Sequence, residues 1–337
     1  MRTIGIPTDV LVAPDSFKGT FSAREVAEAV ARGLAASGQP AELCPVADGG
    51  EGTFDALADA LRLEAVEAQA SDPLGRPLIA VFGLGAGVAL VETAAASGLA
   101  LVSESERDAV AASTYGTGQL IAAAARAGAR EIYVAVGGSA TTDGGEGALR
   151  AIAEAGGLGA ARLSVLCDVR TPFEEAARVF APQKGADAQT VVELSRRLDQ
   201  VAGRFARDPR GVPMTGAAGG LAGGLWAQLG AELMPGAAFV LSAIDYDARM
   251  RAARAVVTGE GRLDRQSLAG KLVSEVATRA RQAGVPCHAV VGGNLLEPFD
   301  TRILDLQLVL EASELAEIET AGEQIGNLIA SEHDRGR

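Results

Sequence analysis

Short apolar runs alternate with amphipathic segments along most of this chain. The runs that predict β-strands lie at residues 10–13, 43–46, 132–136, 255–257, 290–291 and 306–310. The first four are each followed by a loop that contains glycine and then by apolar residues at helical spacing. This repeated order of strand, loop and helix is typical of an α/β protein with a parallel sheet.

Two of the helix starts carry specific signals. Ser22 and Glu25 have the spacing of a capping box, so a helix is predicted from this point to about Ala36. Thr53 is predicted to cap the next helix, whose apolar side chains fall on one face at Phe54, Leu57, Ala58 and Leu61. Two further helices are predicted, one as far as about residue 155 and one from about residue 268.

Residues 72–99 differ from this pattern. Proline and glycine turns surround the apolar segments 78–82 and 88–91, which predicts antiparallel strands and the start of a second domain. A length of 337 residues is also typical of two domains. The Gly/Ala-rich segment 215–224 is interpreted either as a hinge or as a tightly packed helix start.

The composition narrows the range of partners. Net charge is −13, and such a surface repels nucleic acid and anionic membranes. No apolar run approaches the 18 residues that span a bilayer, and the first residues carry no secretion signal. We therefore expect a cytoplasmic protein that binds neither nucleic acid nor membrane.

The cysteines and histidines offer little chemistry. Cys44, Cys167 and Cys287 are few and widely spaced, which predicts buried, reduced thiols. No Cys/His cluster has the spacing of a zinc site, and His288 is interpreted as a strand residue. Acid–base chemistry is therefore expected to fall to Asp, Glu or Lys.

Lysine is rare and lies next to glycine. Only three of the 30 basic residues are lysines, namely Lys18, Lys184 and Lys271, and each has a glycine neighbour. Lysine is a compact point charge, whereas arginine is a planar fork. A point charge beside glycine-opened backbone is suited to holding phosphate, so we interpret these lysines as phosphate contacts. An accident of small numbers is the alternative.

Two loops combine charge with glycine in the first part of the chain. The loop 15–20 places Lys18 and Ser16 just before a helix, which suits a phosphate contact or, alternatively, an exposed turn. The loop 48–53 has Asp48 and Glu51 around two glycines, and these carboxylates can face one cation or one proton. A flexible acidic turn is the simpler interpretation.

Two further loops follow later strands. Residues 137–145 contain four glycines, three hydroxyls and Asp143, and we interpret them as a nucleotide phosphate cradle rather than a mere packing connection. Residues 258–271 bring two acids, two arginines and Lys271 together, unless they form an inert charge cluster. Such loops meet at the carboxyl edge of a parallel sheet, and phosphoryl transfer needs this combination of amides, cations and carboxylates.

No familiar nucleotide motif is present. Arg265 replaces the first glycine of a Walker motif that would end at Lys271. Asp264 replaces the third glycine of a dinucleotide motif that would begin at Gly259.

Together the four loops resemble the bacterial glycerate kinase family, of the glycerate 2-kinase type. The segments that carry the resemblance are 13–19, 47–53, 72–76, 95–99, 114–118, 137–145, 167–169, 182–186, 216–220 and 258–271. They occur in the family's order, and all three lysines lie within them. The segment 170–177 departs from the family pattern, which leaves substrate specificity open.

The resemblance implies a fold and a reaction. The fold is two dissimilar α/β domains, one a flavodoxin-like, doubly wound parallel sheet, with the active site in the cleft between them. We place the flavodoxin-like domain at residues 1–70 plus about 235–337, and the second at about 71–234. The implied reaction is ATP- and Mg²⁺-dependent phosphorylation of D-glycerate, with 2-phosphoglycerate the favoured product. Whether the chain forms a homodimer stays open.

The four loops and the matching segments 72–76, 167–169 and 182–186 supply the candidate roles. As catalytic residues we predict Lys18, Asp48, Glu51, Lys184, Asp264 and Lys271. For substrate binding we predict Ser16, Arg76 and Arg262, the arginines through a bidentate fork to a carboxylate. For nucleotide binding we predict Gly137, Gly138, Ser139, Thr141 and Thr142. As metal ligands we predict Asp143, Asp168 and Glu260.

Three other functions stay open. A kinase of another small hydroxy acid would share the same loops. A nicotinamide-dependent hydroxy-acid enzyme would have a complete Gly-x-Gly-x-x-Gly and usually a histidine base, and neither is found. A non-catalytic anion-binding protein would need the cationic loops without several carboxylates beside them.

Overall fold

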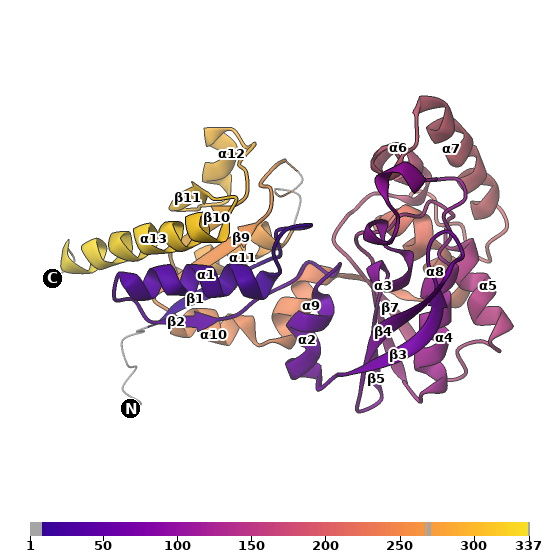
Figure 1. The fold of residues 1–337 in the computed structure, drawn as a ribbon, viewed down its shortest axis with the longest axis horizontal. Coiled ribbons are helices and arrows are strands. Elements are labelled where there is room, and N and C mark those ends of the chain that lie inside the picture. Colours follow the sequence, from indigo (N-terminus) through magenta and orange to yellow (C-terminus); the bar gives the residue numbers. More distant parts are fainter. Residues whose placement is uncertain (1–8, 266, 268–270, 336–337) are drawn as a thin grey trace. The chain divides into compact units, whose positions relative to one another are not determined.

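The computed structural model describes residues 9–265, 267 and 271–335. The chain folds into two compact units, drawn with their elements in Figure 1. The first unit combines Met1–Asp48 with Val240–Arg337, and the second is Gly49–Phe239. The second unit is therefore inserted into the sequence of the first.

The first unit is built on a five-stranded parallel sheet. Its strands are β1 (Val10–Pro14), β2 (Ala41–Leu43), β9 (Ala255–Glu260), β10 (Cys287–Val291) and β11 (Leu308–Glu311). Their order across the sheet is β2-β1-β9-β10-β11. Counted within this unit alone the order is 2-1-3-4-5, which is the flavodoxin-like order. The fold class implied by the resemblance is confirmed.

Helices cover both faces of this sheet. Helices α1 (Ala23–Ala36) and α13 (Leu315–Arg335) pack on one face, against Val10, Val257 and Val290. Helix α11 (Leu272–Ala283) packs on the other face through Val273. Helix α10 (Tyr246–Ala252) contacts α11. Helix α12 (Pro298–Ile303) follows β10 in the chain. Apolar side chains alternate between the two faces because successive residues of a strand point in opposite directions.

The first and last helices of the chain lie side by side in Figure 1. Two glycines allow them to approach closely: a Cβ atom at Gly33 would lie 1.9 Å from the carbonyl oxygen of Glu319, and one at Gly322 would lie 2.4 Å from that of Val30. The predicted capping box of α1 is confirmed, since Ser22 and Glu25 each bond the other's backbone amide.

The second unit contains a mixed six-stranded sheet. Its strands, in the order in which they pair, are β3 (Glu64–Ser71), β4 (Pro77–Gly85), β5 (Val88–Glu92), β6 (Glu131–Ala135), β7 (Arg162–Cys167) and β8 (Glu232–Pro235). Strand β4 pairs antiparallel with β5, as predicted, and also with β3, for which no strand was predicted, whereas β5 to β8 run parallel. The turns of the 72–99 segment therefore produce hairpins rather than crossovers.

Helices connect and cover these strands. They are α2 (Thr53–Leu61), α3 (Ala94–Ser97), α4 (Tyr115–Arg126), α5 (Glu146–Glu154), α6 (Ala176–Phe180), α7 (Ala188–Ala202) and α8 (Leu221–Leu229). The next helix, α9 (Gly236–Ala243), contains the boundary between the two units, which falls after Phe239. The largest core cluster joins β5, β6 and β7 to α4, α5 and α8. The segment 215–224 is a tightly packed helix start, because Gly219 and Gly223 approach neighbouring backbone too closely for a side chain.

Several local predictions differ from the structure. Strand β2 ends at Leu43 rather than residue 46. The N-cap of α2 is Gly52, at a φ of 89°, because the Thr53 hydroxyl instead donates to the Gly50 carbonyl. The chain leaves the first unit at Asp48, whereas we placed this boundary near residue 70. Residues 49–70 pack with the second unit because β3 pairs with β4 over its whole length.

The predictions for the cysteines and for His288 are confirmed. All three cysteines are buried free thiols, and His288 lies fully buried in β10. Within the described part of the chain, no helix has the length and apolar character needed to cross a membrane.

Candidate active site

One polar cluster lies at the carboxyl ends of β1 and β9, in the first unit. These strands pair in parallel with Pro14 opposite Gly259, so Asp15, which follows β1, and Glu260, which ends β9, lie at the same edge. Residues 17–21 form a turn that carries Lys18, whose ammonium lies 2.6 Å from Oδ2 of Asp48. Charged groups that are distant in sequence therefore gather at this edge.

Burial makes two acids of this cluster, Asp15 and Glu260, hard to ionise. Asp15 is 4% exposed, and burial together with the Asp48 carboxylate raises its pKa to about 8, against the opposing charge of Lys18. Burial also raises the pKa of Glu260, whose Oε1 atom has no hydrogen-bond partner among the described residues. The charges of Lys271 and Lys18 act in the opposite direction on that pKa, which places both lysines near Glu260.

The other predicted residues of this unit lie around the cluster. The backbone amide of Ser16 donates to Asp15. The exposed Arg262 pairs with Asp264 at 3.3 Å, and the Asp264 backbone bonds Ser267. Gln266 and Gly270, two residues of the last motif, lie outside the described residues.

A second polar region lies at the carboxyl ends of β5 and β6, in the second unit. There the glycine-rich loop after β6 touches the segment before α2: a Cβ atom at Gly137 would lie 2.7 Å from the Cα of Gly50. A Cβ atom at Gly138 would lie 3.5 Å from a carboxylate oxygen of Glu51. Glu51 therefore lies beside this loop, whereas Asp48 pairs with Lys18 in the first unit.

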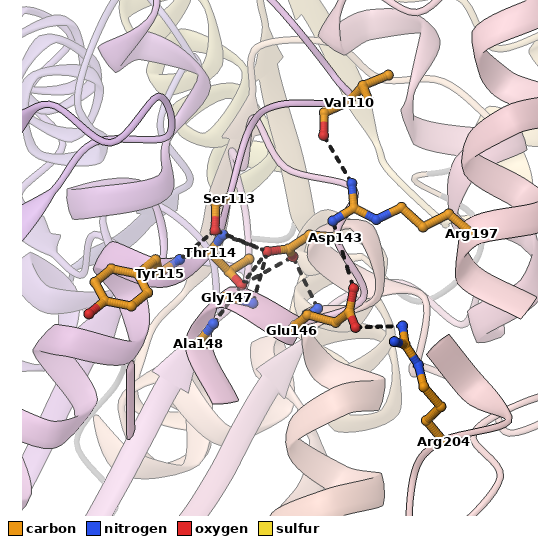
Figure 2. A network of polar contacts seen from close by, with 11 residues as sticks. Val110, Ser113, Thr114, Tyr115, Asp143, Glu146, Gly147, Ala148, Arg197 and Arg204 are labelled. Carbon is orange, nitrogen blue, oxygen red and sulfur yellow. Dashed lines mark hydrogen bonds and ion pairs between the residues drawn. The ribbon is translucent and has the colours of Figure 1, made fainter. Parts of the chain in front are cut away.

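The Asp143 carboxylate accepts hydrogen bonds from the backbone amides at the start of α5 (Figure 2). Its carboxylate accepts hydrogen bonds from the Gly145 and Gly147 amides at 3.0 and 3.2 Å, and from the Thr114 amide at 2.8 Å. The Thr114 hydroxyl donates to it as well. The Gly145 amide, which belongs to the loop that we expected to cradle phosphate, is therefore engaged by the protein's own carboxylate. Asp143 as a metal ligand stays a prediction, and this geometry does not favour it.

Glu92 likewise accepts a hydrogen bond from a backbone amide in the first turn of α2. Its Oε1 accepts the Phe54 amide at 2.8 Å, and burial raises the pKa of this carboxyl to about 7. The sequence did not point to Glu92, and it placed Asp15 and Thr114 in matching segments without giving either a role. Asp15 and Glu92 end or follow apolar strands, so their position at a sheet edge was the available signal.

Lys184 is buried, unlike Lys18. It is 2% exposed, and its ammonium donates to the Ser139 hydroxyl at 3.1 Å and to the Thr141 carbonyl. Burial lowers the pKa of Lys184 to about 7, against the opposing charge of Asp143. The hydroxyls of Thr141 and Thr142 are buried without a partner in the described part of the chain. Two of the predicted nucleotide-binding residues, Ser139 and Thr141, thus contact a buried lysine.

The remaining predicted residues lie apart from these groups or engage the protein itself. Arg76 pairs with Asp72 and, at 2.8 Å, with Glu106. Asp168 follows β7 and is half-buried. Across the residues described by the structure, no three His, Cys, Asp or Glu side chains group as metal ligands. Glu260 belongs to the first unit and Asp143 and Asp168 to the second, so this set of metal ligands stays a prediction.

Comparisons with known proteins give a consistent result. The model of the glycerate kinase family matches residues 10–156 and 154–322. A glycerate kinase of Bacillus subtilis is 39% identical over 325 residues, and the match covers 84% of each chain. The glycerate 2-kinase of Escherichia coli K12 is 37% identical over 322 residues, again covering 84% of each chain.

A solved structure has the same fold. The crystal structure of a protein assigned as glycerate kinase 2 from Salmonella typhimurium LT2 superposes with a TM-score of 0.78. It is 30% identical and covers 97% of this chain and 99% of its own.

Proposed function

Because this chain belongs to the glycerate kinase family, we propose that it transfers the γ-phosphoryl group of ATP to a hydroxyl of D-glycerate. The chain is a kinase, a phosphotransferase that acts on an alcohol group. ATP as the donor and 2-phosphoglycerate as the product are the finer parts of the proposal. The name of the Escherichia coli relative, glycerate 2-kinase, supports this product.

The observation that carries the proposal is the cluster around the Lys18–Asp48 pair. Phosphoryl transfer depends on positioning and on charge stabilisation rather than on covalent chemistry by the protein. The Lys18 side chain is 55% exposed, so its ammonium can reach a phosphate oxygen. Asp48 would orient the attacking hydroxyl, and Lys271 and Asp264 would add charge at the same edge. Ser16 and Arg262 would bind the substrate there.

The second unit would hold the nucleotide phosphates. Gly137 and Gly138 open the backbone after β6, and Ser139, Thr141 and Thr142 add hydroxyl donors in the same loop. Glu51 lies beside this loop. In contrast, backbone amides at the starts of α2 and α5 already donate to Glu92 and Asp143, so neither helix start is proposed as a phosphate site.

Mg²⁺ fits some of the predicted ligands better than others. The Asp143 oxygens are engaged by amide and hydroxyl donors, which a carboxylate bound to a cation would have to release. Glu260 offers a buried oxygen without a hydrogen-bond partner in the described residues, and oxygen ligands suit this cation. We therefore propose Glu260, with Asp168 as a second candidate, for holding the cation. The bound cation would neutralise phosphate oxygens.

An ADP-release assay across D-glycerate, L-glycerate and other hydroxy acids tests the function. We expect D-glycerate to give the highest kcat/KM, and phosphorus NMR of the product to place the phosphate on the second carbon. MgATP binding without turnover of any hydroxy acid would instead indicate a non-catalytic anion-binding protein.

The panel also addresses the segment that departs from the family pattern. Residues 170–177 place Phe173 in the core, where its ring lies 3.0 Å from a Cβ position at Gly144. A preference for another hydroxy acid would point to this segment, which packs under the proposed nucleotide loop.

A further inference from the structure

Lys184 contacts the glycine-rich loop 137–145 through its buried ammonium group. It ends the short 3-10 helix Pro182–Lys184, is fully buried, and contacts Ser139 and Thr141 through its ammonium group. The carboxylate whose charge acts on it is Asp143, and that carboxylate is already engaged by backbone amides. The two groups that accept hydrogen bonds from the Lys184 ammonium are a neutral hydroxyl and a neutral carbonyl.

This contact fixes the direction of one hydrogen bond. An ammonium group only donates, so the Ser139 oxygen must accept, and the single hydroxyl proton of Ser139 remains to be donated elsewhere. Among the described residues, the Ser139 hydroxyl donates no hydrogen bond. Ser139 is 7% exposed, and the backbone on either side is held, since Leu99 bonds the Gly138 carbonyl and Ala140 bonds the Ser97 carbonyl.

We propose that Lys184 is a positioning residue, whose ammonium directs the Ser139 hydroxyl proton towards an anionic oxygen of a substrate. The inference rests on the proposed function and deepens it, because it assigns to Ser139 the binding of a phosphate or carboxylate oxygen. Lys184 itself does not touch the substrate in this arrangement. Its role differs from that of the exposed Lys18.

The charge state of Lys184 controls the arrangement. A neutral amine has a lone pair and can accept the Ser139 proton, which then no longer serves the substrate. Burial brings the pKa of Lys184 to about 7, with Asp143 acting against this effect. A bound anion favours the ammonium form, so binding above pH 7 should take up a proton.

Steady-state kinetics from pH 6 to 9, with ATP and D-glycerate varied separately, test this inference. The variants are Ser139→Ala, Lys184→Met and the double variant. Ser164→Ala, on β7 and similarly buried at 8% exposure, is the matched control. We expect each single variant to raise one KM by about 10-fold, in line with loss of a hydrogen bond to a charged group. The KM that rises identifies the phosphate or the carboxylate as the bound group.

Two signatures distinguish positioning from a merely structural role. The KM of the double variant should be no higher than the larger of the two single-variant KM values, because both substitutions remove the same donor. The affected KM should rise with pH in the wild type and stay constant in Ser139→Ala. Multiplicative single effects, an unchanged Lys184→Met enzyme, or an Ser139→Ala enzyme that keeps the wild-type pH dependence would each overturn the inference.

Calorimetry of MgATP binding in buffers of different ionisation enthalpy measures the protons taken up on binding. It therefore tests the role of Lys184 independently of whether the protein phosphorylates D-glycerate. If Ser139 binds the nucleotide, proton uptake near pH 8 should be present in the wild type and absent in Lys184→Met, whether or not D-glycerate is turned over. Uptake that persists in Lys184→Met overturns the inference and leaves the proposed function intact. Should Lys184→Met fail to fold, Ser139→Ala carries the test, since its uptake should fall as well.

Discussion

Lys18 and Asp48 form an ion pair, with 2.6 Å between Nζ and Oδ2, although 30 residues separate them in sequence. They meet because β1 and β2 are parallel neighbours whose following loops leave the sheet at the same edge. The Lys18 side chain stays 55% exposed, whereas that of Asp48 is 11% exposed. The lysine is therefore the accessible member of the pair.

Replacing Lys18 by Ala should lower kcat/KM by about 10²–10³, because a donor that stabilises charge in the transition state is lost. ADP release at varied D-glycerate and ATP measures this effect. Arg24→Ala, which removes an exposed basic residue on α1, is the control and should match the wild type. A fully active Lys18→Ala enzyme would remove Lys18 from the proposed site.

Asp15→Asn should stabilise the protein increasingly as pH rises. The unfolded carboxyl loses its proton near pH 3.8, whereas the folded one keeps it to about pH 8, so the folded state binds more protons in this window. Wild-type stability from this group therefore falls from about pH 4 to pH 8, by about 1.4 kcal/mol for each pKa unit.

Melting temperatures of the Asp15→Asn variant and the wild type at pH 5, 6.5 and 8 measure the difference. A difference that stays constant across this range would contradict a raised pKa at Asp15. Glu25→Gln, on the exposed start of α1, provides a comparison in which no such gain towards pH 8 is expected.

His288→Leu should remove part of the acid sensitivity. Burial lowers the pKa of His288 to about 4, and neither ring nitrogen has a hydrogen-bond partner within the described residues. Between pH 6.5 and about 4 the unfolded state binds a proton that the folded state does not, so wild-type stability falls as pH falls. Urea unfolding at pH 7 and pH 4.5 should show a smaller loss for the variant. Equal losses would mean that His288 is charged in the folded protein.

Gly137→Ala should destabilise the second unit by about 1–3 kcal/mol, because the new methyl group would lie 2.7 Å from the Cα of Gly50. Neither residue has a flexible side chain that could move to relieve this contact. It should also lower kcat/KM, since the proposed nucleotide loop would shift. Gly203→Ala is the control, because its methyl group meets nothing closer than 3.7 Å and should change stability by less than about 0.5 kcal/mol. Identical urea midpoints for the two variants would contradict the close contact.

Local signals in the sequence predicted local structure well. The capping box of α1 and the hairpin strands β4 and β5 depend on residues close together in the chain, and both were found as predicted. The N-cap of α2 was wrong because the Thr53 hydroxyl bonds the preceding turn instead. The end of β2 was also misplaced, since the apolar run continues beyond the strand.

The candidate site was predictable in composition but not in geometry. The lysine–glycine pattern selected Lys18 and Lys184 alike, yet one is exposed and the other is fully buried. Asp143 was selected as a ligand, but its donors include Thr114, which is 29 residues away in sequence. Burial and donor partners come from tertiary packing, which residue spacing along one loop does not encode.

The insertion of the second unit into the first has a consequence for synthesis on the ribosome. Strand β1 requires β9 as its neighbour, and α1 requires α13, so the earliest residues must wait for the last ones to emerge. Residues 49–239 are complete long before that point. We expect nascent chains stalled once residue 239 has left the ribosome to protect this middle portion from protease while the leading 48 residues are still digested.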